Sequence, residues 1–354
     1  MDSNWNEIIF FTLFLTFIVL MLVIDLGLFQ KRSHVLSFRE ALGWTAIWVA
    51  ISIGFYFLIK FQGNLIHGAT TLDDLNQRIA LYGHPVNITG LSLQETIEAY
   101  NRNLSLEYLT GYLIEYSLSV DNVFVIVMIF LSFKIRPEYY KKVLFWGILG
   151  AIVMRFIFIF AASALIQRFA WFLLIFGGLL VFIGLKMAWE FLFRRKKEYI
   201  DTEKHPVVRL VSRYFRVTQE DHGDKFWLRK SRKLYVTPMF LVLMIIEFTD
   251  VLFAVDSVPA VFSITRDPYI VFFSNIFAIL GLRSLFFLIM DVMNRFHYLK
   301  IGLSALLTFV GCKMLVYKLN TQYSLYIIAS ILAISIFASN LRNFIQNRKK
   351  LNQP

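Results

Sequence analysis

Long apolar stretches alternate with short polar segments along the whole sequence. A bilayer core of about 30 Å is crossed by roughly 20 mostly apolar residues in a helix, and nine segments satisfy that requirement. They are residues 8–29, 41–59, 106–133, 143–166, 169–193, 238–264, 269–290, 298–317 and 325–345. The pattern predicts an all-α, polytopic membrane helix bundle with about nine spans.

The composition agrees with this prediction and excludes several other classes of protein. The chain of 354 residues is 58% hydrophobic and 17% charged, whereas soluble domains contain about 45–50% apolar and 25% charged residues. Cys312 is the single cysteine, which excludes a disulfide framework. No basic residue precedes the first apolar segment, which is also too long for a signal peptide, so we expect it to remain as a span.

The positions of Lys and Arg predict the orientation. If the N-terminus is outside, 26 of these residues fall in cytoplasmic connections and six in external ones. The positive-inside rule therefore favours an N-out/C-in topology. The connection 194–237 is strongly basic, which we interpret as a topology signal and an attraction to anionic lipid head groups. No nucleic-acid-binding motif accompanies the net charge of +12. The external segment 60–105 is predicted to contain a short helix near residues 91–101.

The third and sixth apolar segments carry the same pattern of acidic residues. Glu115 and Asp121 are six residues apart in the third segment, and they align with Asp250 and Asp256 in the sixth. The segments that follow continue the alignment with basic residues. Any two apolar helices share many Leu and Phe residues by composition alone. Composition does not explain charged residues that recur in the same order.

Arg155 aligns with Arg283, and Lys186 aligns with Lys313 within a shared Phe-x-Gly-x-Lys-Met pattern. A helical triplet that is followed directly by its copy must insert upside down the second time, as in the inverted repeats of secondary transporters. We therefore predict a 3+3 inverted repeat of spans 3–5 and 6–8. The predicted units are two N-terminal spans (1–59), the external segment (60–105), the first triplet (106–193), the basic connection (194–237), the second triplet (238–317) and the last span with its tail (318–354).

Charged residues within the predicted spans are the main candidates for function. The acids are Asp25, Glu115, Asp121, Glu247, Asp250 and Asp256, and the bases are Arg155, Lys186, Arg283 and Lys313. An unpaired Asp, Lys or Arg at the centre of a span costs roughly 2.5–3.5 kcal/mol, so these groups should face the bundle interior and be paired or bind a cation. The acids exceed the bases by two, a balance that a divalent cation would neutralise. The alternative is that all of them form internal ion pairs and bind nothing.

Helical spacing brings several of these residues onto shared faces. Glu247, Asp250 and Ser257 lie on one face of the sixth span, and Glu115 and Asn122 have the same spacing in the third. The carboxylate, amide and hydroxyl groups of these side chains offer only oxygen atoms as metal ligands. Such sites favour Mg²⁺, Ca²⁺ or Mn²⁺ over Zn²⁺ or Cu²⁺, and no His or Cys is suitably placed.

Asp121 and Asp256 lie about 100° away from these faces on an ideal helix. A local unwinding would bring them in, and Pro259 provides a reason for one, because its ring clashes with the carbonyl of Val255. Asp25 is an accessory candidate for one reason, which is its position close to the predicted cytoplasmic face.

Three segments carry a resemblance to a known family. They read EYSLSVDNVFV (115–125), DVLFAVDSVPA (250–260) and FAILGLRSL (277–285), and they resemble the TerC/Alx family of bacterial integral membrane proteins. The resemblance implies a multi-pass inner-membrane protein of the LysE-like transporter superfamily, associated with Mn²⁺ efflux and tellurium resistance. It places the family's acidic signature on Glu115, Asp121, Asn122, Asp250, Asp256 and Ser257.

The leading hypothesis is a secondary transporter that exports Mn²⁺ or a similar hard divalent cation, with proton antiport as the coupling. In this hypothesis the cation binds Asp121 and Asp256. Further ligands or proton acceptors are Glu115, Asp250 and Glu247, and the four basic residues balance the charge of the unloaded site. No nucleotide-binding motif or permanently bound cofactor is expected, and an enzyme is disfavoured because Asp256 lacks the Gly-x-Gly-Asp setting of intramembrane aspartyl proteases. The alternative is a non-transporting membrane partner in the metal loading of exported proteins or in tellurite resistance.

Overall fold

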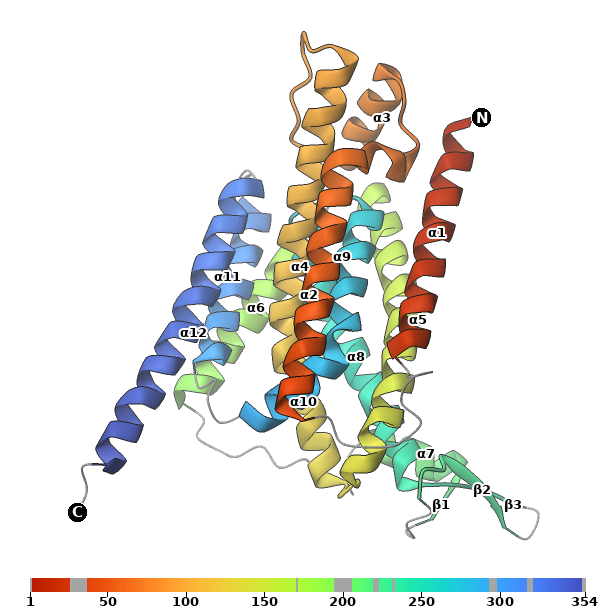
Figure 1. Ribbon diagram of the computed structural model, residues 1–354, viewed down its shortest axis with the longest axis vertical. Coiled ribbons are helices and arrows are strands. Elements are labelled where there is room, and N and C mark those ends of the chain that lie inside the picture. Colours follow the sequence, from red (N-terminus) through yellow and green to blue (C-terminus); the bar gives the residue numbers. More distant parts are fainter. Residues whose placement is uncertain are drawn as a thin grey trace.

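The computed structural model describes residues 2–25, 37–169, 171–193, 206–218, 223–230, 233–292, 298–316 and 321–351 (Figure 1). The helices are α1 (Asp2–Asp25), α2 (Phe38–Gln62), α3 (Leu72–Tyr82), α4 (Leu93–Ser132), α5 (Tyr140–Arg168), α6 (Phe172–Phe193), α7 (Pro206–Tyr214), α8 (Pro238–Phe262), α9 (Pro268–Leu280), α10 (Leu282–Val292), α11 (Leu299–Val316) and α12 (Thr321–Leu351), with the short 3₁₀ helices η1 (Gly63–His67) and η2 (Pro137–Tyr139). The predominantly helical fold is therefore confirmed.

Fewer helices qualify as spans than the nine predicted. Among the described residues, seven helices are long and apolar enough to cross a membrane, or eight if the bent pair of α9 and α10 counts as one span. The predicted eighth span corresponds to α11, whose apolar part is shorter than this requirement. The count of nine, the N-out/C-in orientation and the inverted repeat thus stay predictions.

The segment between α2 and the predicted third span is more ordered than expected. Ser92 and Glu95 form a capping box, in which each side chain bonds the backbone of the other, and the helix that begins there runs without a break to Ser132. The predicted short helix at 91–101 and the predicted span at 106–133 are thus one helix, α4. Together with η1 and α3, its first turns form one end of the molecule (Figure 1).

The described part of the basic connection lies at the opposite end of the bundle and is not purely helical (Figure 1). It contains α7 and a small sheet in which β1 (Arg216–Val217) pairs parallel with β3 (Lys233–Val236), and β2 (Trp227–Lys230) pairs antiparallel with it. The all-α prediction is therefore wrong for this segment. Lys142 of α5 ties the segment to the bundle through an ion pair of 2.8 Å with Asp224.

The predicted break in the sixth span is not observed. α8 stays helical through Pro259, and the N–H of Ser263 donates to the carbonyl of Pro259 at 3.0 Å. The proline lies in the last turn, so its missing N–H removes only one bond near the helix end. The break occurs in the seventh span instead, where α9 and α10 meet at Gly281 with a bend of 42°.

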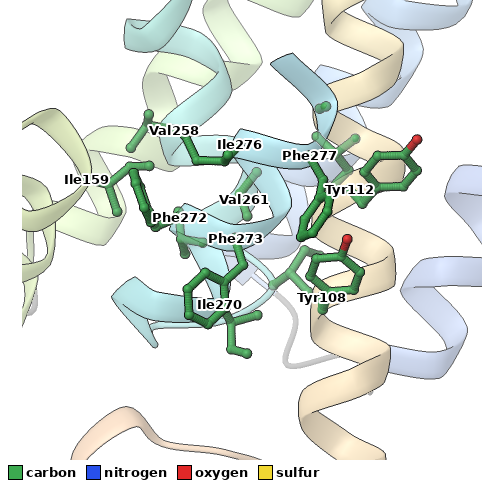
Figure 2. Close-up of a cluster of buried hydrophobic side chains, with 14 of the residues drawn as sticks. Tyr108, Tyr112, Ile159, Val258, Val261, Ile270, Phe272, Phe273, Ile276 and Phe277 are labelled. Carbon is green, nitrogen blue, oxygen red and sulfur yellow. The ribbon is translucent and has the colours of Figure 1, made fainter. Parts of the chain in front are cut away.

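α9 lies at the centre of the bundle. All its residues except Tyr269 are buried, and its aromatic side chains contact α4, α5 and the two N-terminal helices. Figure 2 shows Phe277 beside Tyr108 and Tyr112 of α4, with ring centroids 6.0 Å apart for Phe277 and Tyr108. A polar side chain on this helix therefore has no access to solvent and must bond within the protein.

Small residues allow α6 and α11 to pack closely. A Cβ added to Gly311 would lie 2.7 Å from the backbone nitrogen of Val181 and 2.8 Å from the carbonyl oxygen of Gly177. Backbone atoms cannot move aside at low cost, so glycine is required for this approach. These two helices come from different triplets of the predicted repeat, and their contact joins the triplets.

We expect Gly311→Ala to lower the free energy of unfolding by about 1–3 kcal/mol, the usual cost of overpacking. Thermal unfolding of the purified protein in detergent measures this. Gly54→Ala is the matched control, because nothing lies within 4 Å of the added Cβ and alanine is the better helix former. Equal effects of the two substitutions would show that the α6–α11 contact does not depend on the small residue.

Candidate cation site

Arg155 of α5 organises the polar centre of the bundle. Its side chain is completely buried, and its Nη1 donates to Glu115 of α4 and, at 2.6 Å, to Oδ1 of Asn275 on α9. Nη2 donates to Oδ1 of Asp250 on α8 at 3.3 Å. Nη1 also lies 3.4 Å from the hydroxyl of Ser257. One guanidinium thus joins four helices.

Two of the predicted acids therefore contact the same guanidinium group, that of Arg155. Glu115 belongs to the first predicted triplet and Asp250 to the second, and they occupy aligned positions. Both bond Arg155. The carboxylates are held close together because the positive charge between them offsets their repulsion and the cost of their burial.

A small cavity lies beside this ion-paired group. Its volume is about 20 Å³, and its polar lining comes from Asn122 and Asp250. Apolar residues of α4, α5, α8, α9 and α10 complete the wall, among them Gly147 and Phe253. A volume of about 10–15 Å³ suffices for one water molecule, so the cavity has room for one water or one small ion. Both predicted triplets contribute to it.

Glu247 lies one turn from Asp250 on α8, in a partly buried position. Its carboxylate packs against the Cα of Gly150 on α5, where a larger residue would collide with it. Asp256 is also partly buried and is close enough to Glu115 and Arg155 for electrostatic interaction. Of the predicted acids of α8, Asp250 lines the cavity, and the helix shows none of the unwinding that the sequence suggested for Asp256.

The remaining predicted residues are distributed differently. The side chains of Asp121 and Asp25 lie outside the described residues. Arg283 is buried, whereas Lys186 is exposed on α6 and is not brought to the cavity. Lys313 is buried, and its attraction is to Glu107 of α4, a residue that we did not include in the site.

The structure does not assemble a complete metal cage from charged ligands. Among the described side chains, no three Asp, Glu, His or Cys residues stand where one metal ion could bind them together. The guanidinium of Arg155 lies between Glu115 and Asp250 and occupies the position that a shared cation would need. Any cation held by both carboxylates must therefore displace Arg155.

Sequence reasoning missed Asn275, which is completely buried. Its amide nitrogen donates to the carbonyl of Val271 at 3.1 Å, and its amide oxygen accepts from Arg155. A signal existed, since an amide in the otherwise apolar run 268–280 must find a partner inside the membrane.

The second missed group lies at the α3 end of the molecule. His67 pairs with Asp267, the N-cap residue of α9, at 2.8 Å, and His84 pairs with Glu107 at 3.0 Å. All four side chains are at most 1% exposed. The two histidines lie in a segment that reads as an ordinary connection in the sequence, so only the folded structure reveals these pairs.

The pair of His84 and Glu107 predicts a dependence of stability on pH. Burial lowers the pKa of His84, but the hydrogen-bonded carboxylate of Glu107 and the charge of Asp267 together outweigh burial and raise this pKa above its ordinary value of 6.5. Protonated His84 therefore contributes stability that is complete below about pH 6.5 and is lost as the pH rises through the folded pKa. We expect the melting temperature to fall as the pH rises above about 6.5, and His84→Gln to remove part of that fall. Parallel curves for the two proteins would contradict this assignment.

Comparison with known proteins identifies the family. The model of the integral membrane protein TerC family matches residues 100–350. This chain belongs to the TerC family. It is 39% identical to an uncharacterized membrane protein of Myxococcus xanthus over 93% of this chain and 91% of that protein. It is 38% identical over 95% of both chains to a Salmonella typhi protein named "Putative membrane-bound redox modulator Alx", and 37% identical to the Escherichia coli K12 protein of the same name over 95% of this chain and 96% of that one.

TerC membership agrees with the apolar helices described above, so the chain is an integral, multi-pass membrane protein. The match with the TerC model covers α4 to α12, which include Arg155 and the cavity. No solved structure matches the chain.

Proposed function

We propose that this protein is a secondary transporter that exports Mn²⁺ or a similar hard divalent cation across the bacterial inner membrane in exchange for protons. The observation that carries the proposal is the meeting of Glu115 and Asp250 at Arg155, beside a cavity lined by both predicted triplets. A site near the midplane between two inverted halves is the arrangement of secondary transporters.

The charge of the group suits a divalent substrate. Glu115, Asp250 and Asp256 carry a total of three negative charges when ionised, and Arg155 offsets one of them. The remaining two match the charge of one Mn²⁺ ion. Carboxylate, amide and hydroxyl oxygens, as supplied by Asp250, Asn122 and Ser257, suit Mg²⁺, Ca²⁺ and Mn²⁺.

In the unloaded protein, the guanidinium of Arg155 supplies the positive charge that the substrate cation would otherwise supply. It keeps the buried carboxylates paired, so the unloaded site does not leave bare charges in a medium of low dielectric. When a cation enters from the cytoplasmic side between the triplets, it replaces Arg155 at Glu115 and Asp250. Rocking of one inverted triplet against the other then exposes the site to the outside.

Divalent cation uptake into everted membrane vesicles tests the proposal. With an acidic lumen, the protein should accumulate Mn²⁺ more strongly than vesicles that lack it, and Mn²⁺, Mg²⁺, Ca²⁺, Co²⁺ and Zn²⁺ should be compared. Absence of uptake of every ion, with the protein present in the vesicles, would instead favour a non-transporting partner in metal loading or tellurite resistance.

The name of the Alx relatives suggests a redox role as the other interpretation. Cys312 is the only cysteine of the chain, so a disulfide cannot form and exchange within one molecule. An effect on cellular redox balance would then follow indirectly from the cytoplasmic level of a redox-active cation such as Mn²⁺.

A further inference from the structure

A second buried ionisable group lies on the same helix as the cation site. Nδ1 of His84 and Oε1 of Glu107 are 3.0 Å apart, and the amide of Asn103 donates to the same carboxylate oxygen at 2.8 Å. Glu107 precedes Glu115 by eight residues in α4, which corresponds to about 12 Å along the helix axis. The group therefore lies between the cavity and the α3 end of the molecule (Figure 1).

Three polar atoms of this group have no described hydrogen-bond partner. They are Nε2 of His84, Oε2 of Glu107 and the hydroxyl of Tyr100. The rings of His84 and Tyr100 are in contact, with centroids 5.5 Å apart. Buried polar groups are nearly always bonded to the protein or to ordered water. Three such atoms around one pair indicate a place for ordered water.

The charged groups around His84 and Glu107 differ from those of the cation site. Asp267 acts on His84 electrostatically, and Lys313 of α11 acts on Glu107. Tyr82 contacts the His84 ring, with centroids 5.9 Å apart. Glu107 therefore has its own histidine and lysine partners and does not share Arg155.

We propose that His84 and Glu107 form an outer proton-binding site, through which the protons exchanged for the cation enter the protein. This inference rests on the proposed function and on the N-out/C-in orientation, which places α3 outside. It gives the external segment a role, since His84 belongs to that segment.

The proton transfer balances at the two side chains. Nε2 of neutral His84 takes up a proton from external water, and Nδ1 releases its own proton to Oε1 of Glu107. Glu107 becomes a neutral acid, and His84 is left neutral with its proton on the other nitrogen. Protonated Glu107 passes the proton inward to an acceptor of the cation site such as Glu115. Rotation of the imidazole ring then returns the remaining N–H to the side of Glu107 and restores the starting arrangement. An imidazole with one bonded nitrogen and one buried nitrogen that has no described partner is suited to such a relay.

Two transport modes in vesicles separate this role from cation binding. Net uptake driven by a pH gradient requires proton binding, whereas the exchange of Mn²⁺ for radioactive ⁵⁴Mn²⁺ at equal pH requires only the loaded carrier. We expect Glu107→Gln and His84→Gln to reduce gradient-driven uptake by about tenfold or more. Exchange should change by less than about twofold, because the cation site is untouched. Glu98→Gln, which alters an exposed acid of the same helix, should leave both modes unchanged.

The outcomes are distinct. Retention of gradient-driven uptake in both variants would overturn the inference and leave the proposed function intact. Loss of both modes in both variants, with the proteins present in the membrane, would also overturn it, because Glu107 would then belong to the cation path itself. A wild-type protein that moves no cation in either mode would contradict the proposed function.

Discussion

Asp250→Asn is expected to reduce cation transport by about 100-fold or more. Asp250 is the one carboxylate among the described residues that both lines the cavity and bonds Arg155. At an effective dielectric constant of about 20, the interaction energy of two unit charges about 4 Å apart is about 4 kcal/mol. The amide keeps the size of the side chain and removes that charge, so the cavity wall remains while the attraction for a divalent ion is lost.

Initial rates of Mn²⁺ uptake, normalised to the amount of protein in the vesicles, measure this effect. Asp73→Asn is the matched control, because Asp73 is exposed on α3 at the end of the molecule. Wild-type rates for Asp250→Asn would show that the cavity beside Arg155 is not the transport site, even if other acids prove essential.

Arg155→Gln is expected to destabilise the protein more strongly than Gly311→Ala. It leaves Glu115 and Asp250 buried without their shared counter-charge, and the loss of one partner from a buried ion pair costs about 3–5 kcal/mol. Thermal unfolding in detergent should show a large decrease in melting temperature. The conservative Arg155→Lys should recover only part of the loss, because a lysine cannot reproduce the planar fork with which the guanidinium donates to three neighbouring helices.

The double substitution Arg155→Gln with Glu115→Gln provides the decisive comparison. If the cost comes from an uncompensated carboxylate, removal of that carboxylate should restore part of the stability. Arg168→Gln, on the exposed end of the same helix, should have little effect. Additive losses in the double variant would show that Arg155 acts through packing and not through its charge.

The sequence identified the chemistry of the candidate site better than its geometry. Charged residues in apolar spans cannot face lipid, so Glu115, Asp250 and Arg155 could be assigned to the interior from cost alone. Their alignment between two triplets also indicated that they belong together. The same reasoning did not distinguish Lys186 from Lys313, because a lysine near a span end can extend along its helix to the interface.

Other features depended on tertiary contacts that no local pattern encodes. Pro259 is a strong signal for a break, yet its cost depends on how near it lies to the helix end, and the bend occurs at Gly281 instead. The partners of His67 and His84 come from α9 and α4. Such pairs arise when segments distant in sequence pack together, so the external segment appeared to be only a connection.

The unbroken course of α4 has a mechanical consequence. Its 40 residues form a rod about 60 Å long that carries Glu107 near one end of the bundle and Asn122 at the cavity. A rigid rod that tilts by about 5° about its middle displaces its tips by about 2–3 Å in opposite directions. A molecule that binds the α3 end and tilts α4 would therefore shift the cavity wall as well.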